Sequence, residues 1–223
     1  MDARDDILAH LRAAREGAGR TRSAALADVQ AAFAARAQGP HPAREADLVA
    51  CLRREALRMS SSVAEVSGMH EVPGAIARYL ADAGLAPRGV VWPRGVVWPR
   101  LAGLDWAAAG LALEPRAARD DDLVGVTGCF CAVAETGTLM TCSAPDAPAA
   151  ASLLPGTHVA VVPVSRIVAG MEEGWALARR ELGTLPRAVN FISGPSRTGD
   201  IEMTIVLGAH GPSRVHLVLV REA

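Results

Sequence analysis

The sequence predicts an α/β fold in which helices cover a sheet of short strands, preceded by a helical extension. From Ser60 onward, short apolar runs alternate with helical patterns, which is typical of α/β proteins. The run from Thr157 to Val164 is almost continuously apolar, as expected for a strand buried on both faces. Before Ser60 the chain is rich in Ala and Arg and shows only helical patterns. We therefore expect a helical extension over residues 1–59 and an α/β domain over residues 60–223.

Three helices are expected in the extension. The patterns place them over residues 2–16, from a cap at Thr21 or Ser23 to about Ala37, and over residues 43–59. A Gly-Pro-His-Pro segment separates the last two. This quarter of the chain contains no cluster of polar residues, so we expect it to pack on the main domain or to contact a partner.

Strands and helices alternate through the α/β domain. Pro73 is expected to start a helix that Gly84 ends. Ser165 is expected to cap a helix from Ile167 to Glu181. The expected strands, in chain order, are Ser62–Val66, Thr157–Val164, Ala188–Ser193, Ile201–Leu207 and Val215–Val220.

One internal repeat interrupts this order, because Arg88-Gly-Val-Val-Trp-Pro93 recurs directly as Arg94-Gly-Val-Val-Trp-Pro99. The preferred interpretation is a tandem duplication in which one copy forms a strand, ended by its proline, and the other lies in a loop. The alternative is an aromatic binding pair of Trp92 and Trp98.

Composition excludes several classes of function. The 223 residues include 23 basic and 24 acidic ones, for a net charge of -1, which gives no electrostatic case for nucleic acid or an anionic membrane. No lysine is present, which excludes Schiff-base catalysis and a Walker-type P-loop. No apolar run reaches the ~18 residues of a membrane span, and the first residues lack a signal-peptide core. We expect a soluble, cytoplasmic protein.

The four cysteines do not form a recognisable metal or cluster motif. None of their spacings is C-x-x-C, so neither a structural zinc site nor an iron–sulfur site is supported. Cys129 and Cys131 could form a redox pair, but two small buried thiols are the preferred interpretation. Asp200, Glu202 and His210 could donate metal ligands, although their spacing is not diagnostic. We expect no metal and no cofactor in this chain.

The densest cluster of polar residues lies between Phe191 and Glu202 and is followed by Gly208-Ala-His-Gly-Pro212. A loop of this composition at the end of a strand presents backbone N–H groups, hydroxyls and one cation, which are suited to an anion. Arg197 is a natural bidentate partner for a carboxylate. The candidate ligand-binding residues are Ser193, Gly194, Ser196, Arg197, Thr198, Asp200 and Glu202.

A second candidate segment is the Glu-Thr-Gly-Thr turn at residues 135–138. Thr136 and Thr138 could bind a phosphate or carboxylate, and Gly137 permits close backbone approach. Glu135 is a candidate nucleophile or general base; alternatively, it caps a neighbouring helix or pairs with an arginine.

His210 is a candidate proton acceptor, although a structural hydrogen bond would also explain it. We predict that Glu135, Thr136, Thr138, Ser196, Thr198, Asp200 and His210 line one pocket.

Three motifs in order resemble the lactate-utilization protein C family, also called LUD-domain, YkgG-like or DUF162 proteins. They are Glu-Thr-Gly-Thr at 135–138, Ser-x-Thr-x-Asp-Ile-Glu at 196–202 and Gly-x-His-Gly-Pro at 208–212. The resemblance spans roughly residues 60–223 and is most specific from Ala134 onward. The duplicated hexapeptide, and the Arg and Gly within the second motif, depart from the pattern and leave the ligand open.

The resemblance implies a three-layer α/β/α sandwich of the NagB/RpiA/CoA-transferase-like type. It also implies a cluster-free subunit of a bacterial L-lactate oxidation system, which binds a small anionic ligand or iron–sulfur partner proteins, with the clusters only in those partners. One alternative is a stand-alone enzyme, similar to CoA-transferases or the cyclo-ligase, that uses Glu135. The other is a non-catalytic scaffold. Whether the chain is itself an enzyme stays open, and a homo-oligomer is possible.

Overall fold

The computed structural model describes residues 3–17, 21–35, 37, 39–40, 45–92, 101–201 and 204–222. The chain divides into two compact units, Met1–His41 and Pro42–Ala223. The first contains the helices α1 (Ala3–Gly17) and α2 (Arg22–Ala35). Helix α3 (Leu48–Arg58), which the sequence analysis grouped with the extension, lies in the second unit because it buries apolar side chains in that unit's core.

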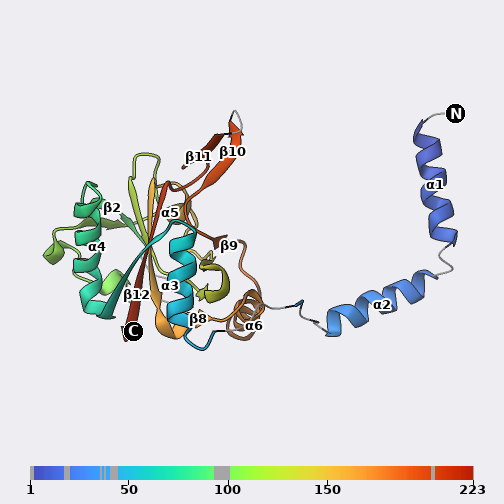
Figure 1. Ribbon diagram of the computed structural model, residues 1–223, viewed down its shortest axis with the longest axis horizontal. Helices are drawn as coiled ribbons and strands as arrows, with labels where there is room; N and C mark the ends of the chain where they lie inside the picture. Colours follow the sequence, from blue (N-terminus) through green and yellow to red (C-terminus); the bar gives the residue numbers. More distant parts are fainter. Residues whose placement is uncertain are drawn as a thin grey trace. The chain divides into compact units, whose positions relative to one another are not determined.

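The second unit is built on a six-stranded, fully parallel sheet (Figure 1). Its central strands are buried on both faces, as predicted for Thr157–Val164. The strand order is β1 (Ser62–Gly68), β12 (Arg214–Glu222), β7 (Thr157–Pro163), β4 (Val124–Thr127), β2 (Arg88–Val91) and β3 (Ala112–Pro115).

Helices cover both faces of this sheet, which confirms the predicted three-layer α/β/α fold. On one face α4 (Val72–Asp82) packs Val72, Ile76 and Leu80 against valines of the central strands. On the other face lie α3 and the short α5 (Ala150–Leu153) (Figure 1). The described 3₁₀ turns that connect elements around this sheet are η1 (Met69–Glu71), η2 (Leu101–Gly103), η3 (Ala107–Ala109) and η5 (Val164–Arg166).

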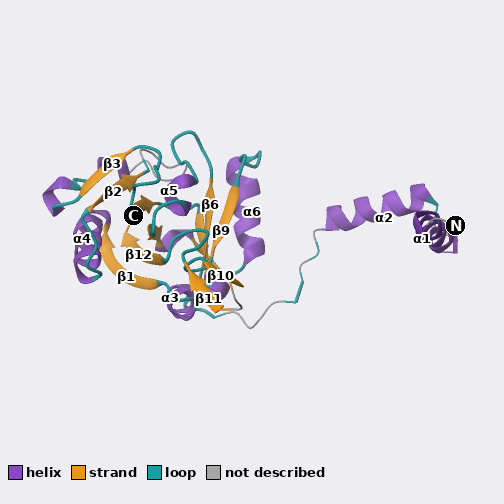
Figure 2. Cartoon of the chain, turned by 90° about the horizontal axis from the view of Figure 1, so that it is seen from above, coloured by secondary structure: helices purple, strands orange, loops and turns teal. Residues whose placement is uncertain are grey.

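A smaller mixed sheet packs beside α3 on that second face. Its strand order is β8-β5-β6-β9, and its inner side shares a core with β7 and β12. Helix α6 covers its outer side (Figure 2). The bounds are β5 (Cys131–Val133), β6 (Thr138–Cys142), β8 (Ile167–Val168), β9 (Val189–Ile192) and α6 (Met171–Leu182).

Two local predictions are corrected by the structure. Ser165 does not cap α6, because Ile167 and Val168 pair with β5 as β8, and the helix begins only after Gly170. The polar segment expected to be a loop before one strand is instead the first strand of a hairpin, β10 (Arg197–Ile201), paired with β11 (Thr204–Leu207).

Of the duplicated hexapeptide, the first copy forms β2. Trp92, next to β2, is buried, and its indole N–H donates to the carbonyl of Pro148 at 3.1 Å. The second copy, with Trp98, lies outside the described residues, so the aromatic-pair alternative stays a prediction.

Two buried histidines lie in the parallel sheet. The Nε2 of His158 is 2.7 Å from the Thr127 hydroxyl, and the Nδ1 of His216 is 2.8 Å from the Ser62 hydroxyl. Burial lowers the pKa of each histidine to about 4. Both rings are therefore neutral parts of the core near neutral pH. No helix in the described part of the chain combines the length and the apolar run that a membrane crossing requires.

Candidate functional site

The candidate site is organised by the C-terminal end of α3. Asp47 caps the start of the helix, and its carboxylate accepts the N–H groups of Val49 and Ala50 at 3.0 Å. It ends where Ser60 adopts a φ of 65°, the left-handed region that non-glycine residues rarely occupy. This turn leaves the carbonyl of Met59 at the helix end available to groups outside the helix.

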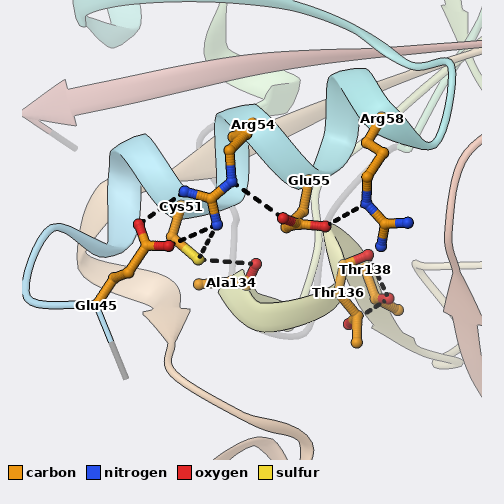
Figure 3. A network of polar contacts seen from close by, with 8 residues as sticks. All are labelled: Glu45, Cys51, Arg54, Glu55, Arg58, Ala134, Thr136 and Thr138. Carbon is orange, nitrogen blue, oxygen red and sulfur yellow. Dashed lines mark hydrogen bonds and ion pairs between the residues drawn. The ribbon is translucent and has the colours of Figure 1, made fainter. Parts of the chain in front are cut away.

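The Glu-Thr-Gly-Thr turn packs directly on this end of α3 (Figure 3). Its 3₁₀ turn η4 (Ala134–Thr136) is closed by Gly137, which has a φ of 64°. A Cβ at Gly137 would lie 2.5 Å from the nitrogen of Ala56 and 2.6 Å from the carbonyl carbon of Glu55. Only glycine therefore meets both the conformation and the close approach.

Three hydroxyls form a chain beside this turn. The Oγ1 of Thr138 is 2.7 Å from the Oγ1 of Thr136 and 2.7 Å from the Oγ of Ser193. The antiparallel register of β6 and β9, which pairs Leu139 with Ile192, brings Ser193 opposite Thr138. Thr138 is buried, whereas both ends of the chain are exposed. Three hydroxyl protons serve two links in this chain. When Thr138 donates to one neighbouring hydroxyl, that exposed neighbour keeps its own proton for an outside acceptor; the other acceptor within reach of Thr138, the Thr136 carbonyl, is farther away at 3.5 Å.

The segment after Ser193 packs on the same end of α3. Gly194 has a φ of 76°, and a Cβ there would lie 2.1 Å from the carbonyl oxygen of Met59. The Nη2 of Arg197 donates to that same oxygen at 3.0 Å and to the Ser60 hydroxyl at 2.6 Å. The cation thus offsets the negative end of the helix dipole.

We call this region the α3 junction; it comprises Glu55, Arg58, Met59, Ser60, Thr136, Gly137, Thr138, Ser193, Gly194 and Arg197.

The carboxylate of Glu55 binds two guanidinium groups, one from Arg58 within the α3 junction and one from Arg54 just outside it. The Glu55 carboxylate accepts the Nε–H of Arg58 at 2.7 Å and the Nε–H of Arg54 at 3.1 Å. The hydrogen bond from Arg58 is the main reason why the pKa of Glu55 lies below its usual value; burial opposes this effect, and Arg54 adds to it. Arg54 is also bound through both Nη atoms to the carboxylate of Glu45.

Glu135 lies at the start of a different helix. Its Oε1 accepts the N–H of Met171, the first residue of α6, at 3.1 Å. Glu173 accepts the neighbouring N–H of Gly170 at 3.0 Å. The structure therefore gives Glu135 the helix-capping contact that was the alternative to a catalytic role, and its action as a nucleophile or base stays a prediction.

The remaining predicted site residues lie around the hairpin. The backbone N–H of Ser196 donates to the carbonyl of Pro212, and its carbonyl accepts the N–H of Gly208. Thr198 is buried within the hairpin, opposite Val206. His210 is exposed, and no hydrogen bond or ion pair within the described residues joins it to Glu135 or to the hydroxyl chain.

The side chain of Asp200, and Glu202 as a whole, lie outside the described residues. A single pocket lined by all seven predicted residues therefore stays a prediction. The structure shows that two of these residues, Thr136 and Thr138, come together at the α3 junction.

The four cysteines belong to hydrophobic cores. Cys51 and Cys129 pack between α3 and the parallel sheet, whereas Cys131 and Cys142 face α6. Burial raises the pKa of Cys131 to about 12 and that of Cys142 to about 11, and it also raises the pKa of Cys129. These thiols are suited to packing rather than to reactivity. Within the described residues no group of three or more His, Cys, Asp or Glu is placed to bind a metal.

Sequence reasoning missed the end of α3. Glu55 and Arg58 fall in a segment that was grouped with the helical extension, and Ser60 is the first residue after it; all three lie 75 or more residues before the turn that they face. The only local signal is the i, i+3 spacing of Glu55 and Arg58, which is common on exposed helices.

Comparisons with known proteins agree with this architecture. A family model described as the LUD domain matches residues 100–220, more than half of the chain. A crystal structure of a DUF162 family protein from Deinococcus radiodurans has a TM-score of 0.58 and 28% identity, covering 80% of this chain and 99% of that one.

Two curated relatives carry the same name. Lactate utilization protein C of Bacillus subtilis is 39% identical over 102 residues, covering 44% of this chain and 42% of that protein. Its namesake from an Exiguobacterium species is 38% identical over 119 residues, covering 49% of this chain and 50% of that protein. The matches thus span half or less of the length of these relatives.

Proposed function

The chain belongs to the LUD domain family, and on that premise we propose that it is a component of a lactate-utilization system that binds a small carboxylate at the α3 junction. The observation that carries the proposal is the hydroxyl chain Thr136–Thr138–Ser193, whose two exposed ends can donate to an outside acceptor on the side of α3 from which Arg58 extends (Figure 3). The process in this proposal, lactate utilization, is taken from the names of the relatives.

The redox step is assigned to partner proteins that carry iron–sulfur clusters. Oxidation of L-lactate to pyruvate removes two electrons, and the four cysteines of this chain are divided between two hydrophobic cores rather than gathered in one site. In this proposal the chain binds and orients the carboxylate, and its partners accept the electrons.

Thermal-shift screening of the purified chain tests which compound is the ligand. The panel contains L-lactate, pyruvate, nucleotides, CoA esters and folates; a ligand at about 100 times its Kd adds roughly 2.7 kcal/mol of stability, which is easily visible as a shift in Tm. We expect L-lactate or pyruvate to raise the Tm of the wild type and to lose this effect in Thr138→Val, which keeps the shape of the side chain.

Other outcomes of the same screen point to other functions. A CoA ester or folate shift that Glu135→Ala abolishes would replace our proposal with a stand-alone enzyme. No shift with any compound would contradict binding by this chain, and the scaffold alternative would then be preferred.

A further inference from the structure

We propose that Arg58 binds the carboxylate of the ligand at the α3 junction, and that Glu55 is the positioning residue that aims it. Sequence reasoning assigned this role to Arg197. The inference rests on the proposed function and specifies the ligand class further, as short 2-hydroxy or 2-oxo carboxylates.

The three guanidinium groups near the end of α3 differ in which of their donors are already bound. Arg54 uses its Nε and both Nη atoms on Glu55 and Glu45. Arg197 uses its Nη2 on the end of α3, through Met59 and Ser60. Arg58 uses only its Nε, and among the described residues neither of its Nη atoms has a partner. Its Nη pair is therefore the fork that can take both oxygens of a carboxylate.

Arg58 extends toward the hydroxyl chain. Figure 3 shows the Arg58 side chain descending from α3 toward Thr136 and Thr138. The close approach of Gly137 to the backbone of Glu55 and Ala56 fixes the distance between this turn and the helix. A ligand held by Arg58 on this side of α3 thus lies next to the hydroxyl chain.

Glu55 orients the Arg58 side chain. The Glu55 side chain is only 12% exposed, and its carboxylate binds the Nε of Arg58 at 2.7 Å, whereas the Arg58 side chain is 67% exposed. When a carboxylate holds a guanidinium at its Nε, the edge formed by the two Nη groups faces in another direction and stays open to a second carboxylate. Glu55 thus reduces the freedom of a long side chain before the ligand arrives, which lowers the entropic cost of binding.

The chemistry of the site then defines the ligand. The Nη pair binds the two carboxylate oxygens, and the free hydroxyl of Thr136 or Ser193 donates to an oxygen on the adjacent carbon. A hydroxyl or a keto oxygen there satisfies this donor equally well. Short 2-hydroxy and 2-oxo acids fit this description, whereas an amide of the same shape lacks the negative charge.

Calorimetric titration of the full chain with L-lactate and with neutral L-lactamide tests the inference. We expect the wild type to prefer L-lactate by at least about tenfold, and Arg58→Gln to lose that preference, as is typical of a lost charge-assisted pair of hydrogen bonds. Arg58→Lys should restore only part of it, because a lysine keeps the charge without the fork.

Arg53→Gln is the matched control, since it removes the same charge from the same helix at a residue that is 59% exposed and 3.9 Å from Glu65. It should change the preference by less than about twofold. Glu55→Gln leaves Arg58 charged but removes the carboxylate that holds its Nε. This variant should show a smaller preference for L-lactate over L-lactamide than the wild type, but should still prefer L-lactate. A purely structural role for Glu55 would lower affinity for both compounds equally.

Two results would overturn the inference, and only the second would also contradict the proposed function. If the wild type prefers L-lactate and Arg58→Gln keeps that preference while Arg197→Gln loses it, then Arg197 is the carboxylate ligand and the proposed function stands. If the wild type binds neither L-lactate nor pyruvate, the inference and the proposed ligand both fail.

Discussion

The six-stranded sheet and the α3 junction both contain hydroxyl groups paired with polar neighbours, yet they differ in where those pairs end. In the sheet, the Thr127 hydroxyl and His158 form a pair that is fully buried, so no outside molecule reaches either group. At the α3 junction only the central Thr138 is buried, and the hydroxyls of Thr136 and Ser193 lie at the surface. A candidate site differs from a buried core pair in that the ends of its polar chain are exposed, and not merely in containing polar groups.

The largest effect is expected for Gly137→Ala, which should push the Glu-Thr-Gly-Thr turn, and with it the hydroxyl chain, away from α3. The substitution combines a left-handed φ of 64° with a Cβ placed 2.5 Å from the Ala56 nitrogen. We expect a loss of about 2–4 kcal/mol in the free energy of unfolding, measured by urea denaturation. Binding of L-lactate should fall as well.

Gly103→Ala is the control for this substitution, because no heavy atom lies within 4 Å of a Cβ at that position. It should change the free energy of unfolding by less than about 0.5 kcal/mol. If Gly137→Ala and Gly103→Ala have the same free energy of unfolding, the turn does not depend on its close contact with α3. The helix would then not fix the position of the hydroxyl chain.

On the sheet side of the comparison, acid should destabilise the protein through His158. Its pKa is about 4 in the folded chain against 6.5 ordinarily, because burial disfavours the charged ring. As pH falls below 6.5 the unfolded chain takes up the proton first, so stability is full above pH 6.5 and decreases toward pH 4. The contribution of this residue should be up to about 3 kcal/mol.

Unfolding measured from pH 7 to pH 4 in the wild type and in His158→Gln checks this expectation. Glutamine keeps a polar atom near Thr127 without titrating in this range, so the decrease with falling pH should be smaller in the variant. His216, also buried with a pKa of about 4, leaves a residual decrease of the same sign. If the free energy of unfolding falls equally with pH in the wild type and in His158→Gln, protonation of His158 does not limit stability in acid.

The six-stranded sheet and the α3 junction also differ in how far the sequence predicts them. The parallel sheet was predictable because a strand such as β7 is apolar throughout, and the turn at Gly137 because its residues are consecutive. The contact of that turn with α3 was not, since Glu55 and Arg58 look like an ordinary exposed helical pair until the fold places them. The first strand of the hairpin, β10, was mistaken for a loop because it contains Thr, Gly and Asp, and only its pairing with β11 makes it a strand.

Ser193→Ala is the finest test, because it removes one exposed end of the hydroxyl chain and little else. Thr138 keeps its link to Thr136, so the free energy of unfolding should change by less than about 0.5 kcal/mol. Affinity for L-lactate should nevertheless fall roughly three- to tenfold, the effect of one lost hydrogen bond. Ser67→Ala, an exposed serine on β1, should change neither quantity. A loss of stability without a loss of affinity would mean that the Ser193 hydroxyl supports the fold, and that the chain presents its free proton only at Thr136.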